Sequence, residues 1–143
     1  MTLKDKKLLI TDLCARLPYG VKYMKYSWGY DIDQEIPEVE VLECVDKNGY
    51  INHTKVYKIN DIKPYLFPMS SMSEEQDEEL KNIYYSYNNG MFYYTERIFD
   101  RIPFSKMKYF PYQIEEFFNK NHIDYRGLIE KGLAIDATNK NIY

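Results

Sequence analysis

Apolar residues in the first part of the chain recur with the period of a helix and then with that of a strand. Three leucines stand at four-residue spacing and mark one face of a helix: Leu9, Leu13 and Leu17. Thr2 can cap this helix, and the Pro-Tyr-Gly sequence at residues 18–20 ends it. Residues 21–28 then alternate with a period of two, which is typical of a strand. We therefore expect an amino-terminal helix followed directly by a sheet.

Two further strands are expected on either side of a tight turn. Residues 38–45 have a strand pattern and follow a polar, acidic loop over residues 29–37. Residues 46–49 have the sequence Asp-Lys-Asn-Gly, which favours a hairpin turn because Asn and Gly tolerate positive φ. A third strand should lie within residues 50–59, most clearly over residues 55–59. The pattern predicts a small antiparallel sheet of about three strands, with its inner face covered by the first helix.

The second half of the chain has mainly helical patterns. The connector over residues 60–68 contains two prolines, which argue against a long helix or a central strand there. Ser73 and Gln76 have the spacing of a capping box, so a helix is expected over residues 74–87. Shorter helices are expected at residues 95–100, 112–121 and 125–131, the last of them capped by Asp124. Residues 133–135 either add an edge strand or simply pack against the core.

Together these elements predict one compact α+β domain over residues 1–143. Residues 1–68 hold the amino-terminal helix and the antiparallel sheet. Residues 69–135 form a helical half of about three to four packed helices, and residues 136–143 are expected to be a frayed tail. A chain of 143 residues has the length of a single domain with one core.

Composition places the chain among globular proteins, with an unusual number of tyrosines. Hydrophobic residues make up 45% of the chain, charged residues 29%, and 16 residues are tyrosine. These tyrosines either complete a small core or provide a contact surface, because tyrosine offers a large ring at low entropic cost. The net charge of -3 and the pI near 5.5 argue against general nucleic-acid binding, although they leave room for a pocket that takes one nucleotide.

The cysteines and the hydropathy pattern favour a cytoplasmic protein. Cys14 and Cys44 lie within apolar patterns, which indicates buried free thiols rather than a disulfide. Residues 1–7 lack the apolar region of a signal peptide, and no apolar run approaches the length of a membrane span. We therefore expect no association with a membrane.

The sequence patterns of metal sites and of nucleophilic catalysis are not found in this chain. The metal-binding residue types are isolated from one another: His53, His122, Cys14 and Cys44. No serine or cysteine lies in a nucleophile motif, and the glycines do not cluster as they do in a phosphate-binding loop. The sequence thus predicts no metal site and no cofactor, and it assigns no catalytic residue.

Chemically active side chains concentrate near the carboxyl end. His122, Asp124, Tyr125 and Arg126 lie within a few residues of one another. They either form an acid/base or anion-binding cluster, or they are structural, with Asp124 as a helix cap and Arg126 paired to Glu130. An aromatic ring beside a guanidinium suits a nucleobase that carries a phosphate.

Three blocks of the sequence resemble a known group of proteins. They are Leu-Cys-Ala-Arg-Leu-Pro-Tyr-Gly-Val at residues 13–21, Ile-Lys-Pro-Tyr-Leu at 62–66 with Pro-Met-Ser-Ser-Met at 68–72, and Asp-Tyr-Arg-Gly-Leu-Ile-Glu-Lys-Gly-Leu-Ala at 124–134. The blocks resemble an uncharacterised family of small phage and prophage proteins from gut bacteria, to which no activity is attached. The resemblance implies an accessory protein of a phage or mobile element, and it would place the chain in the cytoplasm of the bacterial host. Many such proteins bind host machinery or host signals.

Two classes of function follow from these observations. The first is a non-enzymatic accessory protein that binds a host protein or a small nucleotide-like ligand, for example to sequester a nucleotide signal and counter host defence. The alternative is a small acid/base enzyme that uses His122 and nearby acids, or a purely structural phage component. Whether the chain forms a homo-oligomer stays open. The expected binding residues are His122, Asp124, Tyr125, Arg126, Arg16, Tyr19, Lys63 and Tyr65.

Overall fold

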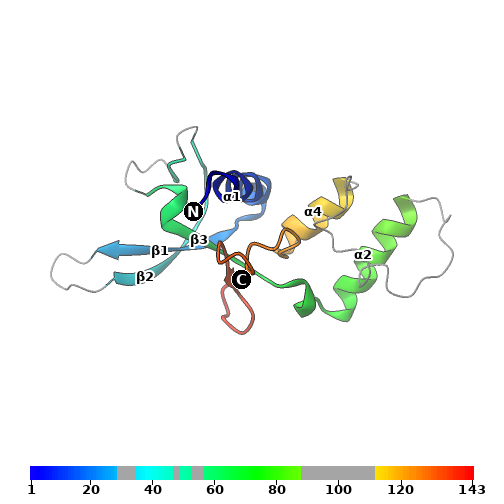
Figure 1. Ribbon diagram of the computed structural model, residues 1–143. Helices are drawn as coiled ribbons and strands as arrows, with labels where there is room; N and C mark the ends of the chain where they lie inside the picture. Colours follow the sequence, from blue (N-terminus) through cyan, green and yellow to red (C-terminus); the bar gives the residue numbers. More distant parts are fainter. Residues whose placement is uncertain (29–34, 47–48, 53–56, 88–111) are drawn as a thin grey trace.

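The computed structural model describes residues 1–28, 35–46, 49–52, 57–87 and 112–143. Within these ranges the chain has the expected α+β character, with the sheet and α1 on one side of the molecule and α2 and α4 on the other (Figure 1). The elements follow one another in this order: α1 (Leu3–Arg16), η1 (Leu17–Tyr19), β1 (Lys22–Trp28), β2 (Glu35–Val41), η2 (Ile59–Asp61), β3 (Ile62–Leu66), η3 (Met69–Ser71), α2 (Glu74–Tyr87), α4 (Tyr112–Lys120) and β4 (Ile135–Asp136).

Two helices begin at the caps that the sequence predicts. The hydroxyl of Thr2 accepts the N–H of Asp5 at 3.1 Å, and the Asp5 carboxylate accepts the N–H of Thr2 at 3.2 Å. At the start of α2, Ser73 and Gln76 make the same reciprocal pair of bonds, at 3.2 Å and 3.0 Å. Each pair satisfies backbone donors that a helix leaves open at its amino end.

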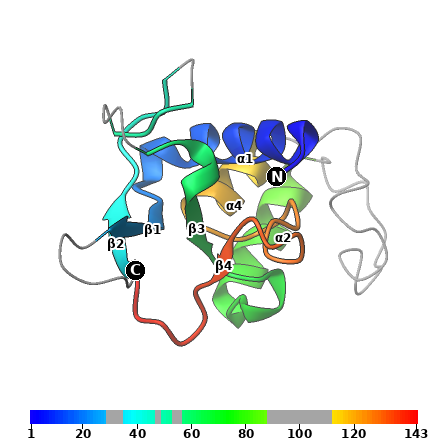
Figure 2. The ribbon, with the colours of Figure 1, turned by 60° about the vertical axis from the view of Figure 1, so that its left-hand side comes forward.

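The sheet is mixed rather than purely antiparallel. Its strand order is β2-β1-β3-β4, with β1 antiparallel to both of its neighbours and β3 parallel to β4. The strand expected from residue 21 is confirmed as β1, whereas the strand expected at residues 38–45 begins earlier, at Glu35, and ends at Val41. In Figure 2, α1 runs above β1 and β3, while β2 and β4 lie at opposite sides of the sheet.

The third strand lies further along the chain than expected. Within residues 50–59 the described part holds only isolated bridges, between Tyr50 and Lys58 and between Val45 and Ile51. Residues 53–56, which held part of the clearest pattern, lie outside the described residues. The strand that pairs with β1 is instead β3, within the proline-containing connector.

Pro64 fits into β3 because the ladder with β1 does not need its missing N–H. Residues of an antiparallel strand alternately direct their backbone groups toward the partner strand and away from it. The N–H of Leu42 donates to the carbonyl of Val21 at 2.8 Å, so Tyr23, two residues further on, bonds toward β2. Pro64 lies opposite Tyr23, and its nitrogen therefore faces away from β1. The expectation that proline excludes a central strand here is wrong because the register decides which N–H groups are used.

The core consists of two apolar clusters. The first joins α1, the sheet and the carboxyl-terminal turn: Leu9, Leu13, Val21, Tyr23, Leu42, Ile51, Ile59, Ile62, Leu66, Leu128, Leu133 and Ala134. The second joins α2, α4 and the segment after α4: Leu80, Ile114, Phe117, Phe118, Ile123 and Tyr125. The segment over residues 121–134 contributes to both clusters, so it connects the two parts of the molecule.

The remaining helix predictions have different outcomes. The helices expected over residues 74–87 and 112–121 are confirmed as α2 and α4, and the one expected over residues 95–100 lies outside the described residues. The helix expected over residues 125–131 is wrong, because the chain forms turns there and Gly127 adopts a φ of +68°. None of the described helices combines the length and the apolar character that a membrane span requires.

Residues 136–143 are attached to the sheet rather than frayed. The N–H of Ala137 donates to the carbonyl of Leu66 at 2.8 Å. The hydroxyl of Tyr143 accepts the N–H of Lys22 at 3.0 Å and donates to the carbonyl of Tyr65 at 2.8 Å. This hydroxyl bridges β1 and β3 just beyond the end of their direct pairing.

The two cysteines are free thiols, as expected, but they are less buried than expected. Cys14 is exposed and Cys44 is half-buried. The buried face of α1 is formed by Leu9, Asp12, Leu13 and Arg16, which leaves Cys14 on the far side. The expectation of a buried Cys14 is therefore wrong, because the helix turns a charged pair inward beside its leucines.

Candidate functional site

A fully buried ion pair stands at the centre of the candidate residues. Arg16 and Asp12 both have zero solvent exposure, and they lie one turn apart on α1. The Arg16 Nε donates to Asp12 Oδ2 at 2.8 Å, and its Nη2 donates to Oδ1 at 3.1 Å. The same guanidinium donates to the carbonyls of Phe118 at 3.2 Å and Ile123 at 2.8 Å. Arg16 therefore ties α1 both to α4 and to the segment that follows it.

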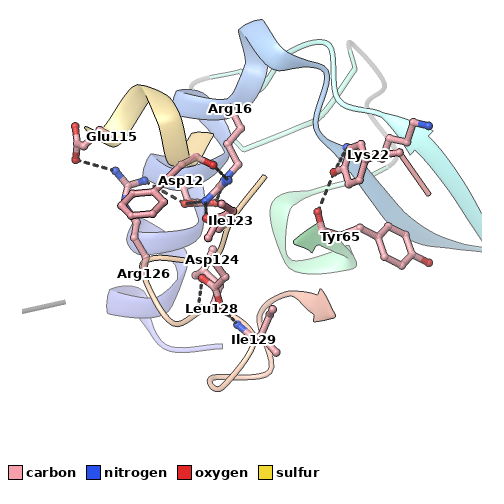
Figure 3. A network of polar contacts seen from close by, with 12 residues as sticks. Asp12, Arg16, Lys22, Tyr65, Glu115, Ile123, Asp124, Arg126, Leu128 and Ile129 are labelled. Carbon is pink, nitrogen blue, oxygen red and sulfur yellow. Dashed lines mark hydrogen bonds and ion pairs between the residues drawn. The ribbon is translucent and has the colours of Figure 1, made fainter. Parts of the chain in front are cut away.

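Arg126 joins this pair from the carboxyl-terminal turn. Its Nη1 donates to Asp12 Oδ1 at 3.2 Å, and its Nη2 lies 3.6 Å from Glu115 Oε1 on α4 (Figure 3). Its side chain is 17% exposed, whereas that of Glu115 is 41% exposed. Two arginines and two acids thus form one charge-balanced network that is most exposed at Glu115. Arg126 is paired with Asp12 and Glu115, not with Glu130, the partner that the sequence suggested.

The Tyr125 ring is enclosed by its neighbours. It stacks on Phe118 with centroids 5.0 Å apart and an interplanar angle of 18°. The guanidinium carbons of Arg126 and Arg16 lie 4.7 Å and 5.7 Å from its centroid. Only 5% of Tyr125 is exposed, and burial is the main cause that raises the pKa of its phenol to about 12. A nucleobase would have to displace these groups to stack on this ring.

Asp124 organises the turn that follows it. Its two carboxylate oxygens accept the N–H groups of Leu128 at 2.8 Å and of Ile129 at 2.7 Å. Only 8% of the residue is exposed. The carboxylate therefore caps backbone donors as the sequence suggested, although the donors belong to a turn rather than to a helix.

His122 is buried in its neutral form. Its ring stacks on Tyr143 at a centroid distance of 4.0 Å, and only 7% of the residue is exposed. Burial, helped by the positive charges of Arg16 and Lys22, lowers the pKa of His122 from 6.5 to about 4, although the Tyr19 backbone and Asp12 act in the opposite direction. At neutral pH this ring carries no charge, and no hydrogen-bond partner of its Nδ1 lies among the described residues.

The other expected residues lie apart from this network or contact it indirectly. Tyr19 donates from its hydroxyl to Glu116 Oε1 at 3.3 Å. Tyr65 is 7% exposed, and its backbone carbonyl accepts a hydrogen bond from the Tyr143 hydroxyl. Lys63 is exposed and lines a separate hollow of about 300 Å³, which is bounded by Met1, Asp5, Asn60, Ile62, Lys63, Lys131, Gly132 and Leu133. The fold thus brings Arg16, Tyr125 and Arg126 together and leaves Lys63 elsewhere.

Some members of these networks were not recognised in the sequence. Asp12 stands four positions before Arg16, and this spacing is a recognisable signal for a helix ion pair. Glu115, Lys22 and Tyr143 reach the candidate residues only through contacts between distant parts of the chain. No local pattern marks such contacts, so only the fold reveals them.

Comparison of the chain with protein-family models, with curated proteins and with solved structures gives no match.

We predict that removing Asp12 destabilises the protein strongly. Asp12→Ala should lower the free energy of unfolding by about 3–5 kcal/mol, because Arg16 would keep a buried charge without its partner. Replacing both residues, with Asp12→Leu and Arg16→Met, should recover part of that loss, because the fully buried Arg16 charge is removed and Arg126 keeps Glu115 as a partner. Urea denaturation of each variant measures these differences.

The exposed pair between Asp77 and Lys81 on α2 provides a matched control, since it has the same one-turn spacing but side chains that are 40% and 51% exposed. Asp77→Ala should cost at most about 1 kcal/mol. Equal losses for Asp12→Ala and Asp77→Ala would contradict the assigned role of the buried pair.

A second prediction concerns pH. The pKa of His122 is lower in the folded protein than its ordinary value of 6.5, so the unfolded chain takes up a proton first as the pH falls. The free energy of unfolding should therefore decrease as the pH falls from about 6.5 to about 4, by up to about 3 kcal/mol. His122→Asn, which keeps a residue that tolerates the φ of +54° at this position, should lack most of this decrease above pH 5. Parallel pH profiles of the wild-type protein and the variant would refute the prediction.

Proposed function

We propose that this chain is a non-enzymatic accessory protein of a phage or mobile element that binds a host protein. The contact surface is the outer face of β1 and β2, the face of the sheet that α1 does not cover. This placement differs from the carboxyl-terminal cluster that the sequence first suggests. It rests on which side chains the fold leaves exposed and which it uses internally.

The observation that carries the proposal is the exposure of two neighbouring valines on one strand. Val39 is 46% exposed and Val41 is 44% exposed, and both lie on the same face of β2. The register places them opposite Met24 and Lys22 of β1. Apolar side chains that stand together on a strand favour contact with another protein, whereas single exposed apolar residues need no explanation.

The opposite face of the same strands is used for folding. Tyr23 is 1% exposed, and it belongs to the apolar cluster that contains Leu9 and Leu13 of α1. The sheet is therefore covered by α1 on one side, and on its other side Val39 and Val41 remain accessible. A protein partner would cover that accessible side.

The state of the polar cluster supports a function without catalysis. A general acid or base needs a pKa near the working pH and access to a substrate. His122 has a pKa of about 4, lowered mainly by burial, and Tyr125, Asp124 and Arg126 make the internal contacts described above. These residues are used to hold the fold together, which favours binding over acid/base chemistry.

A specific observation favours a second candidate, the binding of a small anionic ligand such as a nucleotide. The hollow of about 300 Å³ presents Lys63 and Lys131, with the amide of Asn60 beside them. Asp5 also lines the hollow and counters part of this positive charge. The candidate is therefore weaker than protein binding at β2.

The proposed function predicts that host partners depend on Val39 and Val41. In affinity purification from host lysate followed by mass spectrometry, the variant Val39→Glu with Val41→Glu should lose the proteins that the wild-type chain retains, because two charges would enter an apolar contact. Its unfolding midpoint should stay close to that of the wild type, since both side chains are exposed.

The matched control replaces two exposed apolar residues elsewhere. Leu3 is 90% exposed and Tyr112 is 69% exposed, so Leu3→Glu with Tyr112→Glu makes the same change of charge away from the sheet. This variant should retain the wild-type partners. Equal retention by both double variants, or equal loss, would contradict binding at the sheet.

The second candidate predicts a ligand effect on stability. A panel of nucleotides should raise the unfolding midpoint of the wild-type chain, and Lys63→Ala with Lys131→Ala should remove the rise. A thermal shift assay measures both. No rise with any nucleotide, or a rise that survives the double substitution, would exclude this ligand class at the hollow.

A further inference from the structure

We propose that the free edge of β2 takes up an extended segment of the partner as an added antiparallel strand, with apolar and basic residues alternating along that segment. This inference rests on the proposed function and names the chemistry of the partner. Strand addition supplies affinity through backbone hydrogen bonds and selectivity through alternate side chains.

The register shows which backbone groups of β2 are directed outward. The bond from the Leu42 N–H to the Val21 carbonyl makes these two residues a hydrogen-bonded pair, and such pairs recur at every second residue. Glu40 therefore bonds toward β1, opposite Tyr23. The N–H and C=O groups of Val39 and Val41 lie at the alternate positions and point away from β1.

The open stretch of this edge is short and has defined ends. Pro37 has a carbonyl but no N–H, so the ladder ends there on one side. The carbonyl of Val41 already accepts the side-chain amide of Asn52 at 2.8 Å, which ends it on the other side. Four outward-facing backbone groups lie between these limits: the Pro37 carbonyl, the N–H and the carbonyl of Val39, and the N–H of Val41. An added strand of about five residues, centred opposite Val39, satisfies all of these groups.

The side of β3 that faces away from β1 is already used by this chain. Beyond β3, Tyr65 pairs with Ile135 of β4. The N–H of Phe67 donates to the carbonyl of His122 at 2.9 Å, and the Phe67 carbonyl accepts the N–H of Asp124 at 2.7 Å. The two edge strands of the described sheet are β2 and β4, and β4 spans only Ile135–Asp136, so β2 is the one long enough for a partner to extend (Figure 2).

Side-chain chemistry defines the sequence of the added strand. Residues placed opposite Val39 and Val41 share the outer face with them and should be apolar or β-branched. The residues between them stand opposite the positions of Glu38 and Glu40, and β2 contains no basic residue. The Glu40 carboxylate pairs with Lys25 and accepts the Tyr23 hydroxyl, yet its side chain is still 40% exposed and can meet a further cation. A segment in which apolar residues alternate with lysine or arginine therefore matches the valines on one face of β2 and the glutamates on the other.

A second copy of this chain fits the edge poorly. If β2 pairs with β2 of another copy through the outward groups, the alternation of the ladder places even-numbered residues opposite even-numbered residues. Glu40 then faces Glu38 or Glu40 of the other copy, and like charges directly opposite each other destabilise a sheet. The charge of β2 thus favours a basic segment of a different protein.

The test uses the full chain and a synthetic peptide, Val-Lys-Val-Lys-Val, blocked at both ends. Titration should shift the backbone amide NMR signals of Val39 and Val41 and slow the hydrogen exchange of the Val39 amide. N-methylation of the central valine removes the N–H that donates to the Val39 carbonyl, and it should weaken binding about tenfold or more. N-methylation of a lysine, whose N–H points away from β2, is the matched control and should leave the affinity close to that of the parent peptide.

The charge requirement is tested with Val-Glu-Val-Glu-Val, which should not bind. Strand addition is overturned if the lysine peptide shifts neither valine amide, if both N-methylated peptides bind equally, or if the glutamate peptide binds as well as the lysine peptide. It is also overturned if sedimentation shows a dimer of the chain that Val39→Glu with Val41→Glu dissociates, because a second copy would then occupy the edge. Loss of host proteins in the same double variant would in that case still support binding at this face, so failure of strand addition can be told apart from failure of the proposed function.

Discussion

The buried pair of Asp12 and Arg16 is the constraint on which the rest of the structure depends. A guanidinium without solvent exposure must have its charge balanced and its donors satisfied by the protein itself. Asp12 provides the counter-charge, and the carbonyls of Phe118 and Ile123 accept further N–H groups. Phe118 and Ile123 belong to the second apolar cluster, whereas the leucines of α1 belong to the first. The ion pair therefore fixes how the two clusters are placed against each other.

This constraint changes the interpretation of the carboxyl-terminal residues. Arg126 adds a second cation to Asp12, Tyr125 fills the space between the guanidiniums and Phe118, and Asp124 holds the turn that positions both. Residue types that are common in binding sites here make their contacts inside the molecule. The accessible chemistry lies instead on β2, where the backbone of an edge strand and two exposed valines stand side by side.

The sequence predicted the features that depend on neighbouring residues. The caps at Thr2 and Ser73 and the α+β character follow from local spacing. The position of β3 did not follow, because whether Pro64 is tolerated depends on a register with β1 that local patterns do not contain. The candidate site was placed wherever reactive residue types were dense. The density of such residues in the sequence could not show that Asp12 of α1 and Glu115 of α4 would pair with Arg126 in the carboxyl-terminal turn.

The bridge made by the Tyr143 hydroxyl has a consequence for how the chain folds during synthesis. It joins Lys22 to Tyr65 across the seam between β1 and β3, and it comes from a residue 121 positions after Lys22. The helix and strands at the start of the chain leave the ribosome long before this residue is made. The link between β1 and β3 through Tyr143 therefore forms only after translation has passed residue 143. Until then the early strands must stay soluble with their backbone edges unpaired.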